Sequence, residues 1–407
     1  MIIAHDLGTT GNKASLHDDT GRLLSAVTVS YGAHFADGGV AEQNPDDWWN
    51  AIVEATRRLL AASDTDARQV TGLVVSGQMM GAVLLDPSYQ PVRPAIIWAD
   101  TRSAAQTAQL EERIGTERAY RLTGHRINPT YSIEKIMWVR DNEPDVFDRV
   151  RHVCVAKDFV VHRLTGRLAT DRSDASATNA YEQRAGRWSS EIIAAAGLDE
   201  RLFPEIVEST DVVGTLTDAA AAATGLTRGT RVVMGGGDGP IAAVGAGIVA
   251  PENGAYVCLG TSSWISFASD EPVYDEHMRT MTFDNVVPGS FVPTATMQAG
   301  GAALAWINEV LSPSPMASRF ARSWPRPRRR MPRAEDCSSC RTCSASAPPT
   351  GIPTPPARSS GSAGTTRART SRVPCSRALR STCTRASPRS GRRGRRSTES
   401  TRSAVAR

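Results

Sequence analysis

The sequence lacks any uninterrupted apolar run near the ~20 residues that a membrane-spanning helix needs. Its N-terminus also lacks the basic segment and apolar core of a secretory signal, so we expect a cytoplasmic protein without a membrane partner. Seven histidines are scattered along the chain without the spacing of a metal site. Of seven cysteines, only Cys154 and Cys258 precede residue 337, both in apolar runs, so the sequence indicates no disulfide framework.

Large apolar side chains are nearly missing from the C-terminal segment, residues 321–407. It contains no Lys, Phe or Tyr, one Leu and one Ile, but 21 Arg. Burial of apolar surface contributes about 25 cal/mol per Å², whereas ordering each residue costs about 1–2 kcal/mol. The segment therefore cannot form a packed core and is predicted to be a disordered tail. The first 320 residues carry 26 basic and 39 acidic side chains, so the positive net charge of the chain comes from the tail.

Two short apolar strands in the remaining sequence each run into a Gly-Thr turn, about 250 residues apart. The first turn contains Asp6, Gly8, Thr9, Thr10, Gly11 and Lys13, and the second contains Gly260, Thr261, Ser262 and Ser263. Glycine allows close backbone approach, and consecutive N–H groups with small hydroxyls can surround a phosphate. Either turn alone is more typical of a simple hairpin, but the pair favours a nucleotide held between two lobes.

A third segment, residues 231–247, places one carboxylate after three glycines. A strand that leads into Gly235-Gly236-Gly237-Asp238, followed by a helix of small residues, is a way to present a catalytic acid at the carboxyl end of a strand. The alternative is that Asp238 caps a helix beginning at Pro240. The two roles are compatible.

Strand-like and helix-like segments alternate along the chain, which indicates an α/β fold. The strands are expected at 2–5, 13–17, 23–29, 73–75, 83–85, 95–98, 232–234, 256–259 and 281–287. Helices are expected after Asn44, which has capping and first-turn signals, at 133–140, at 159–164, and from Gly300 to about Leu311.

Five motifs occur in an order and spacing typical of one enzyme family: D-L-G-T-T-G-N-K, G-Q-M-M-G, W-A-D-T-R, G-G-G-D and L-G-T-S-S. Over residues 1 to about 311 the chain resembles the FGGY family of carbohydrate kinases, in its xylulokinase-like branch. The resemblance implies a two-domain, actin-like ATPase (ribonuclease H-like) fold with ATP between the lobes. It implies ATP-dependent phosphorylation of a small-molecule sugar or polyol and, by analogy, a homodimer. The expected domains are 1–245 for sugar binding, 246–311 for the start of the ATP-binding domain, and 312–407 for the tail.

The resemblance assigns roles that suit phosphoryl transfer, which needs positioning and charge neutralisation. Asp6 is expected to hold Mg²⁺, a cation that prefers hard oxygen ligands, and Asp238 to be the general base. The expected phosphate ligands are Thr9, Thr10, Gly11, Lys13, Gly260, Thr261 and Ser262. Lys13 could equally be a solvated strand lysine.

The sugar is expected against Gln78, Met79, Met80, Asp100 and Arg102 in the first lobe, beside Asp238. An Asp/Arg pair suits a hydroxyl-rich ligand, and a helix-capping Asp with a surface Arg is the alternative. Met80 stands where xylulokinases usually have His, and Gly239-Pro240 follows the base where they have Asn, Gln or Ala. The substrate therefore stays open among ketopentoses and polyols. Glycerol is disfavoured because the Arg-Glu pair of glycerol kinases is absent near Gln78.

The tail has the composition expected of GC-rich DNA translated out of frame. If each codon starts at the third base of the written one, residues Asp336–Ile352 can give L-L-F-L-P-Y-L-L-G-E-R-A-P-H-W-D, which resembles the missing family segment. The second domain is then incomplete, and we expect little kinase activity from the chain as written. Two other classes stay open: a non-catalytic sugar-binding remnant, and a nucleic-acid binder that uses the Arg-rich tail, where salt-dependent phosphate contacts are conceivable. The out-of-frame origin disfavours nucleic acid as a partner.

Overall fold

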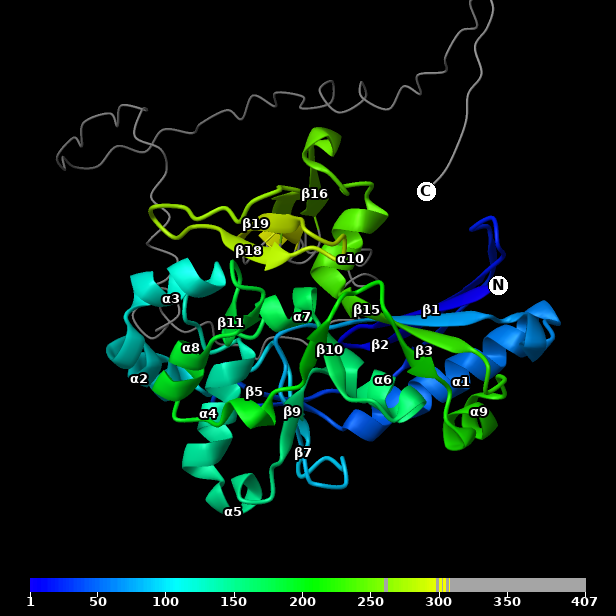
Figure 1. Ribbon diagram of the computed structural model, residues 1–407, viewed down its shortest axis with the longest axis horizontal. Helices are drawn as coiled ribbons and strands as arrows, with labels where there is room; N and C mark the ends of the chain where they lie inside the picture. Colours follow the sequence, from blue (N-terminus) through cyan, green and yellow to red (C-terminus); the bar gives the residue numbers. More distant parts are fainter. Residues whose placement is uncertain (260–262, 298–299, 302, 305–306, 308–407) are drawn as a thin grey trace, which may run out of the picture. The chain divides into compact units, whose positions relative to one another are not determined.

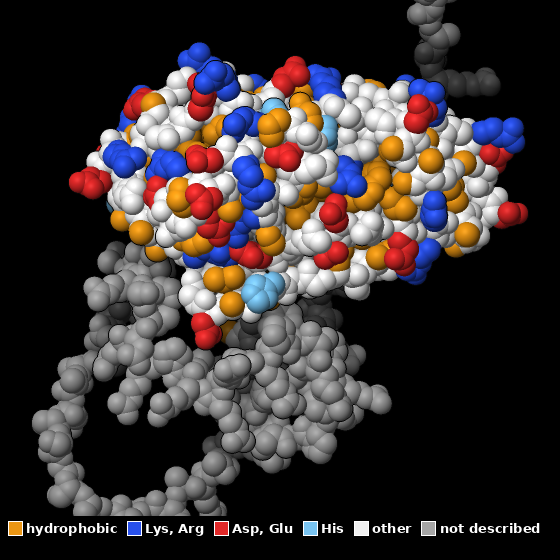
Figure 2. All heavy atoms as spheres, turned by 90° about the horizontal axis from the view of Figure 1, so that it is seen from below, with side chains coloured by type: hydrophobic (Ala, Val, Ile, Leu, Met, Phe, Trp, Pro, Cys, Tyr) orange, Lys and Arg blue, Asp and Glu red, His pale blue; other side chains and the backbone are white. Residues whose placement is uncertain are grey.

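The computed structural model describes residues 1–259, 263–297, 300–301, 303–304 and 307, which belong to one compact unit. The predicted helix from Gly300 to Leu311 and the tail at 312–407 lie largely or wholly outside these residues. In the described part, no helix is long and apolar enough to cross a membrane. Figure 2 shows basic and acidic side chains interspersed over the face it displays.

A mixed six-stranded sheet is the centre of the fold (Figure 1), in the order β14-β15-β6-β1-β2-β3. Strands β1 and β6 pair in parallel, as do β6 and β15, while β2, β3 and β14 run antiparallel to their neighbours. The carboxyl ends of β1, β6 and β15 therefore meet at one edge of the sheet. The strands are β1 (Ile2–Leu7), β2 (Gly11–His17), β3 (Leu23–Ser30), β6 (Gly72–Gly77), β14 (Val212–Thr215) and β15 (Arg231–Gly237).

Helices α1, α6 and α9 lie together on one side of this sheet (Figure 1). The core between them contains Ile3, Leu7, Trp48, Ile52, Leu59, Phe159 and Val160, all at or near zero exposure. The N-terminus of α1 is capped as its sequence predicts: the Asn44 side chain accepts from the Asp46 amide, and a proline occupies the first turn. The helices are α1 (Pro45–Ser63), α2 (Ala104–Ile114), α3 (Thr116–Thr123), α4 (Ser132–Asn142), α5 (Pro144–Phe147), α6 (Ala156–Thr165), α7 (Arg172–Ser176), α8 (Ser190–Ala195), α9 (Asp218–Thr224) and α10 (Asp238–Gly245).

A second, antiparallel sheet follows α10 in the order β16-β17-β19-β18. Its strands are β16 (Ala255–Leu259), β17 (Ser263–Phe267), β18 (Met281–Asp284) and β19 (Phe291–Met297). Three small pairings complete the described part: β4-β5-β8, β7-β9 and β10-β13, together with the hairpin β11-β12. These strands are β4 (His34–Ala36), β5 (Val40–Gln43), β7 (Val83–Leu85), β8 (Ala95–Ile96), β9 (His152–Cys154), β10 (Ala169–Asp171), β11 (Tyr181–Glu182), β12 (Arg187–Trp188) and β13 (Glu205–Val207).

The predicted α/β alternation is present, with shifts at element ends. The strand expected at 95–98 is shorter, because only Ala95 and Ile96 pair with β5. The strand expected at 281–287 ends at Asp284, where its pairing with β19 stops. Helix α10 begins at Asp238 rather than Pro240, so its N-cap is Gly237 and the proposed side-chain cap by Asp238 is absent.

Candidate functional site

The edge where β1, β6 and β15 end brings Asp6, Lys13 and Asp238 together. Lys13 Nζ lies 3.3 Å from Asp6 Oδ2, across the β1–β2 pair. Asp238 is the first residue of α10, directly after β15. Burial by the surrounding protein and, to a smaller extent, the charge of Asp6 raise the pKa of Asp238 to about 6, and the charge of Lys13 opposes the shift. Three groups expected from two separate motifs thus interact electrostatically.

The turn after β1 is held by its own backbone and by two aromatic side chains. The Gly8 amide donates to the Asp6 and Gly11 carbonyls. The Tyr31 hydroxyl donates to the Gly8 carbonyl at 2.6 Å, and Trp98 Nε1 donates to Thr9 Oγ1 at 2.8 Å. Trp98 was not singled out as a site residue from the sequence, although it ends the strand expected at 95–98 and begins the motif W-A-D-T-R. The turn is therefore ordered before any phosphate arrives.

Thr9 and Thr10 differ in their surroundings within this turn. Thr9 is half-buried beneath Trp98, whereas Thr10 is exposed. Gly11 is required by strand packing, since a Cβ there would lie 2.7 Å from the Val29 carbonyl oxygen on β3. The second expected phosphate turn, Gly260 to Ser262, lies outside the described residues.

The surroundings of Asp6 are compatible with a magnesium ion held through water and phosphate oxygens. Its side chain is 41% exposed, and one carboxylate oxygen faces Lys13 while the other has no hydrogen-bond partner among the described residues. In the described part of the chain, no cluster of three or more His, Cys, Asp or Glu forms a ready-made metal cage. Mg²⁺ usually keeps several waters and uses one or two carboxylates plus substrate phosphates, so a lone Asp6 suits it.

Gln78 and Met79 occupy the turn that follows β6. Gln78 is buried and donates to Gln43 Oε1 at 2.7 Å, while its own Oε1 has no partner among the residues that the structure describes. Gln43 in turn donates to the Thr9 carbonyl at 2.8 Å, so one amide connects the expected sugar and phosphate segments. Met79 is buried against Gly237, where a Cβ would lie 2.6 Å from its sulfur. Gln43 lies in none of the motifs named above, so the sequence did not predict it as a site residue. Only its hydrogen bonds to residues distant in the sequence reveal its place in the site.

Met80 belongs to a small apolar cluster beside Asp238. Its φ of 63° is in the left-handed region, which is uncommon for a non-glycine residue. The cluster also contains Met79, Ala177, Met281 and Phe283. The wall that these side chains form offers no hydrogen-bond donor at the position where a xylulokinase-like sequence usually has His.

Asp100 and Arg102 are brought together, but the structure turns them toward the protein. Asp100 is fully buried, accepts from the Ala41 amide at 2.6 Å and pairs with Arg102 at 2.6 Å. Arg102 also pairs with Glu42 at 2.8 Å and stacks over Trp138. This geometry does not favour the direct sugar contacts expected from the sequence, because these charges already have protein partners. It also differs from the alternative, since the arginine side chain is only 9% exposed and Ser103, not Asp100, occupies the N-cap position of α2.

A buried ionic cluster that was not expected from the sequence lies behind this edge. We define it as Lys157, Asp158, Asp171 and Asp174, all fully buried. Lys157 Nζ lies 2.8 Å from Asp158 Oδ1, 3.1 Å from Asp171 Oδ1 and 3.4 Å from Asp174 Oδ2. Burial raises the pKa of Asp174 well above its ordinary value. The available signal was a charged pair inside the apolar run at 153–161.

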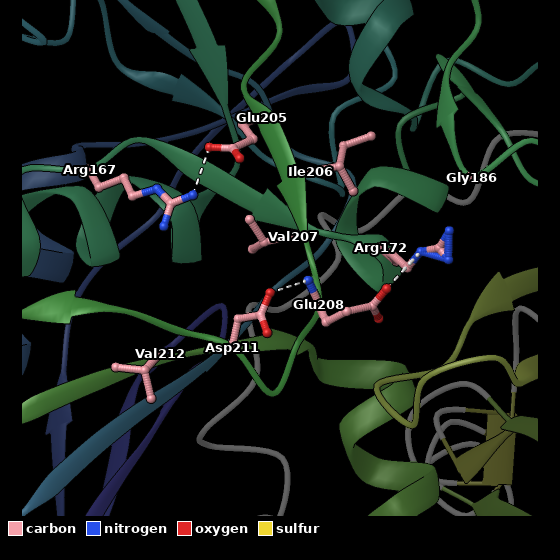
Figure 3. Close-up of a pocket in the computed structure, with 9 residues that line it drawn as sticks. All are labelled: Arg167, Arg172, Gly186, Glu205, Ile206, Val207, Glu208, Asp211 and Val212. Atoms are coloured by element: carbon pink, nitrogen blue, oxygen red, sulfur yellow. Dashed lines mark hydrogen bonds and ion pairs between the residues drawn. The ribbon is translucent and has the colours of Figure 1, made fainter.

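A surface pocket of about 420 Å³ lies elsewhere and contains none of the residues expected from the sequence (Figure 3). Its charged groups pair with one another: Arg167 with Glu205 at 2.7 Å, and Arg172 with Glu208 at 3.5 Å. The Asp211 carboxylate accepts from the Glu208 amide. Because its charges are compensated internally, this pocket is not the candidate site.

Comparisons with known proteins define the class. Residues 1–245 match the description "FGGY family of carbohydrate kinases, N-terminal domain". The structure resembles a xyloylose kinase from Brucella ovis (30% identity, TM-score 0.71, covering 79% of this chain and 65% of that one). It also resembles a xylulose kinase from Rhodospirillum rubrum (26% identity, TM-score 0.73, covering 79% and 65%). The fold is therefore the actin-like fold of sugar kinases, as expected.

The sequence relatives agree. A xylulose kinase of Bacillus subtilis is 33% identical over 314 residues, which cover 77% of this chain and 62% of the relative. A xylulose kinase of Klebsiella pneumoniae is 38% identical over 271 residues, which cover 67% and 55%. The chain belongs to the FGGY family of carbohydrate kinases, as its motifs predicted, and it spans about 62% of the length of its Bacillus subtilis relative.

Proposed function

We propose that the site at this sheet edge serves ATP-dependent phosphorylation of a sugar or polyol, with Asp238 as the general base. The observation that carries the proposal is the electrostatic interaction of Asp238 with Asp6 and Lys13 at the sheet edge where β1 and β15, which flank β6, both end. The relatives named xylulose kinases support a ketopentose as the substrate class. The apolar wall at Met80 favours a test of pentitols and other ketopentoses beside xylulose.

The chemistry follows from these positions. The Asp238 carboxylate takes the proton of the attacking hydroxyl, whose oxygen forms a bond to the γ-phosphorus while the bond to the β-phosphate oxygen breaks and ADP leaves. Asp6 would hold a magnesium ion, which would neutralise charge on the phosphate oxygens. Lys13, Thr9 and Thr10 hold the phosphates, and Gly260 to Ser262 are assigned to the same task by sequence alone.

Gln78 is the best-placed sugar ligand of the β6 turn, because its buried Oε1 has no partner in the described part of the chain and an unpaired buried acceptor is costly. We assign Asp100 and Arg102 a supporting part instead: they fix the segment that carries Trp98 over Thr9. This assignment keeps both residues important for activity without direct contact to the sugar.

The test uses the full chain, with ADP formation and calorimetric sugar binding measured on the same preparation. Asp238→Asn is expected to lower kcat by about 10²–10⁴-fold with little change in KM, while Asp37→Asn at an exposed position serves as the control. In the parent chain kcat is expected to rise with pH through about 6, because only the ionised base accepts a proton. Sugar binding without turnover would support the non-catalytic alternative, and an unchanged kcat in Asp238→Asn would refute the assignment of the base.

A further inference from the structure

The buried ionic cluster is connected by hydrogen bonds to the turn that carries Asp238. The Gly237 amide donates to Ser173 Oγ at 2.9 Å, and Ser173 Oγ donates to Asp171 Oδ2 at 2.5 Å. The other oxygen of Asp171 faces the Lys157 ammonium at 3.1 Å. A continuous path therefore runs from a buried cation to the residue directly before Asp238.

The hydroxyl of Ser173 has only one orientation that serves this path. Asp171 Oδ2 also accepts from the Ser173 amide and from Ser209 Oγ, and its Oδ1 faces Lys157, so Asp171 behaves as an acceptor throughout, as a carboxylate must. Ser173 therefore donates its proton to Asp171, and its lone pairs are left to face the Gly237 amide. The acceptor for that amide is fixed in place by a charge.

The turn itself leaves little room for adjustment. A Cβ at Gly236 would lie 2.4 Å from Val286 Cγ1 and 2.8 Å from Ser173 Oγ. Gly237 is the N-cap of α10 and adopts φ −62° and ψ 147°, and these angles set the direction in which the chain enters Asp238. Ser173 thus accepts a hydrogen bond from the amide of Gly237, and the backbone torsions of Gly237 set the direction of the Asp238 carboxylate.

Buried ion clusters rarely add stability over apolar residues of similar volume, so their presence beside a site suggests another task. We propose that Ser173, oriented by Asp171 and Lys157, is a positioning residue that aims Asp238 at the acceptor hydroxyl. The inference rests on the proposed role of Asp238, and it adds a residue that touches neither sugar nor nucleotide.

Ser209 offers a matched control. Both serines are buried and both donate to Asp171 Oδ2, at 2.5 Å for Ser173 and 2.7 Å for Ser209. Only the Ser173 side chain accepts from the β15–α10 turn. Ser209 contacts the turn through its backbone carbonyl, which accepts from the Gly235 amide and survives substitution by alanine. The two alanine variants therefore lose the same bond to Asp171 and differ in the bond to Gly237.

The experiment measures Asp238 in the full chain by carboxyl carbon NMR, with its resonance assigned by its loss in Asp238→Asn. Ser173→Ala is expected to change the carboxyl carbon shift of Asp238 at a pH where this group is ionised, because the direction of its side chain changes, and to speed hydrogen exchange of the Gly237 amide by roughly fivefold, the factor for one hydrogen bond. Ser209→Ala is expected to leave both unchanged, and Ser173→Thr, which keeps the hydroxyl, is expected to restore both.

Equal effects of the two alanine variants, or no effect of Ser173→Ala on either readout, would overturn the positioning role. Both readouts are independent of turnover. Failure of the base assignment is therefore seen separately, as an unchanged kcat in Asp238→Asn.

Discussion

Lys157→Met is the substitution expected to affect stability most sharply. The ammonium is fully buried and lies within 3.5 Å of three carboxylates, at 2.8, 3.1 and 3.4 Å. Methionine keeps the length of the side chain but leaves Asp158 and Asp171 without their cation. Removal of one partner from a buried ionic group costs about 3–5 kcal/mol. Since a typical domain is stable by only about 5–15 kcal/mol, the loss should be evident in any unfolding curve.

The control lies on the same helix. Arg163 of α6 pairs with Asp46 at 3.1 Å, and its side chain is 28% exposed, so solvent screens the pair. Arg163→Met should cost no more than about 1 kcal/mol, the usual value of a surface pair. Urea denaturation of the full chain, followed by circular dichroism, gives the free energy of unfolding of both variants relative to the parent.

The pH dependence supplies a second check on the same variant. Burial raises the pKa of Asp158, and the charge of Lys157 is the largest factor that opposes the shift. Without Lys157 the folded-state pKa rises further, so the stability present at low pH is lost as pH increases through that value. The difference between Lys157→Met and the parent should therefore widen from pH 5 to pH 8. A cost no larger than that of Arg163→Met at pH 8 would refute this account of the cluster.

Three further substitutions test other parts of the structure. Gly235→Ala should lower the free energy of unfolding by roughly 3 kcal/mol or more, because φ is +71° and a Cβ would lie 1.9 Å from the Val75 carbonyl oxygen. Gly229→Ala, with open space around it, is the control and should change that free energy by no more than about 0.5 kcal/mol. Equal unfolding midpoints of the two variants in urea would contradict the geometry. Asn44→Ala removes the cap of α1 and should cost about 1 kcal/mol in thermal or urea unfolding; no loss would mean that the cap is dispensable. Burial raises the pKa of Asp284 to about 7, so the parent should lose stability as pH rises from about 4 to 7, and Asp284→Asn should flatten that slope; an unchanged slope would show that other groups cause it.

Local patterns predicted the parts of the site that are themselves local. When a strand is followed within a few residues by a glycine turn and a carboxylate, the local sequence predicts both the strand and the place where it ends. The positions expected for Asp6 and Asp238 near strand ends are therefore those observed in the structure. The meeting of these ends required only that β1, β6 and β15 be parallel. Their roles in catalysis stay predictions.

Ion pairs and hydrogen bonds between residues that are distant in the sequence could not be predicted in this way. Asp100 was expected to contact the sugar. Instead, Ala41 and Glu42 on a strand distant in the sequence determine where Asp100 and Arg102 point. Lys157 precedes the helix expected at 159–164 and carried no prediction, and only the approach of β10 and α7 surrounds it with carboxylates. In both cases the sequence contained the charges, and tertiary packing decided their partners.

Trp98 gives the chain an optical probe at its candidate phosphate turn. The indole is 45% exposed and its N–H is committed to Thr9, whereas Trp48 is enclosed in the core. Indole emission responds to the polarity and hydrogen bonding around the ring, so an anion that engages the Thr9 hydroxyl should alter the spectrum of this one residue. Subtraction of a Trp98→Phe spectrum would separate that signal from the other tryptophans. Occupancy of the turn could then be followed in real time, with no label and no need for turnover.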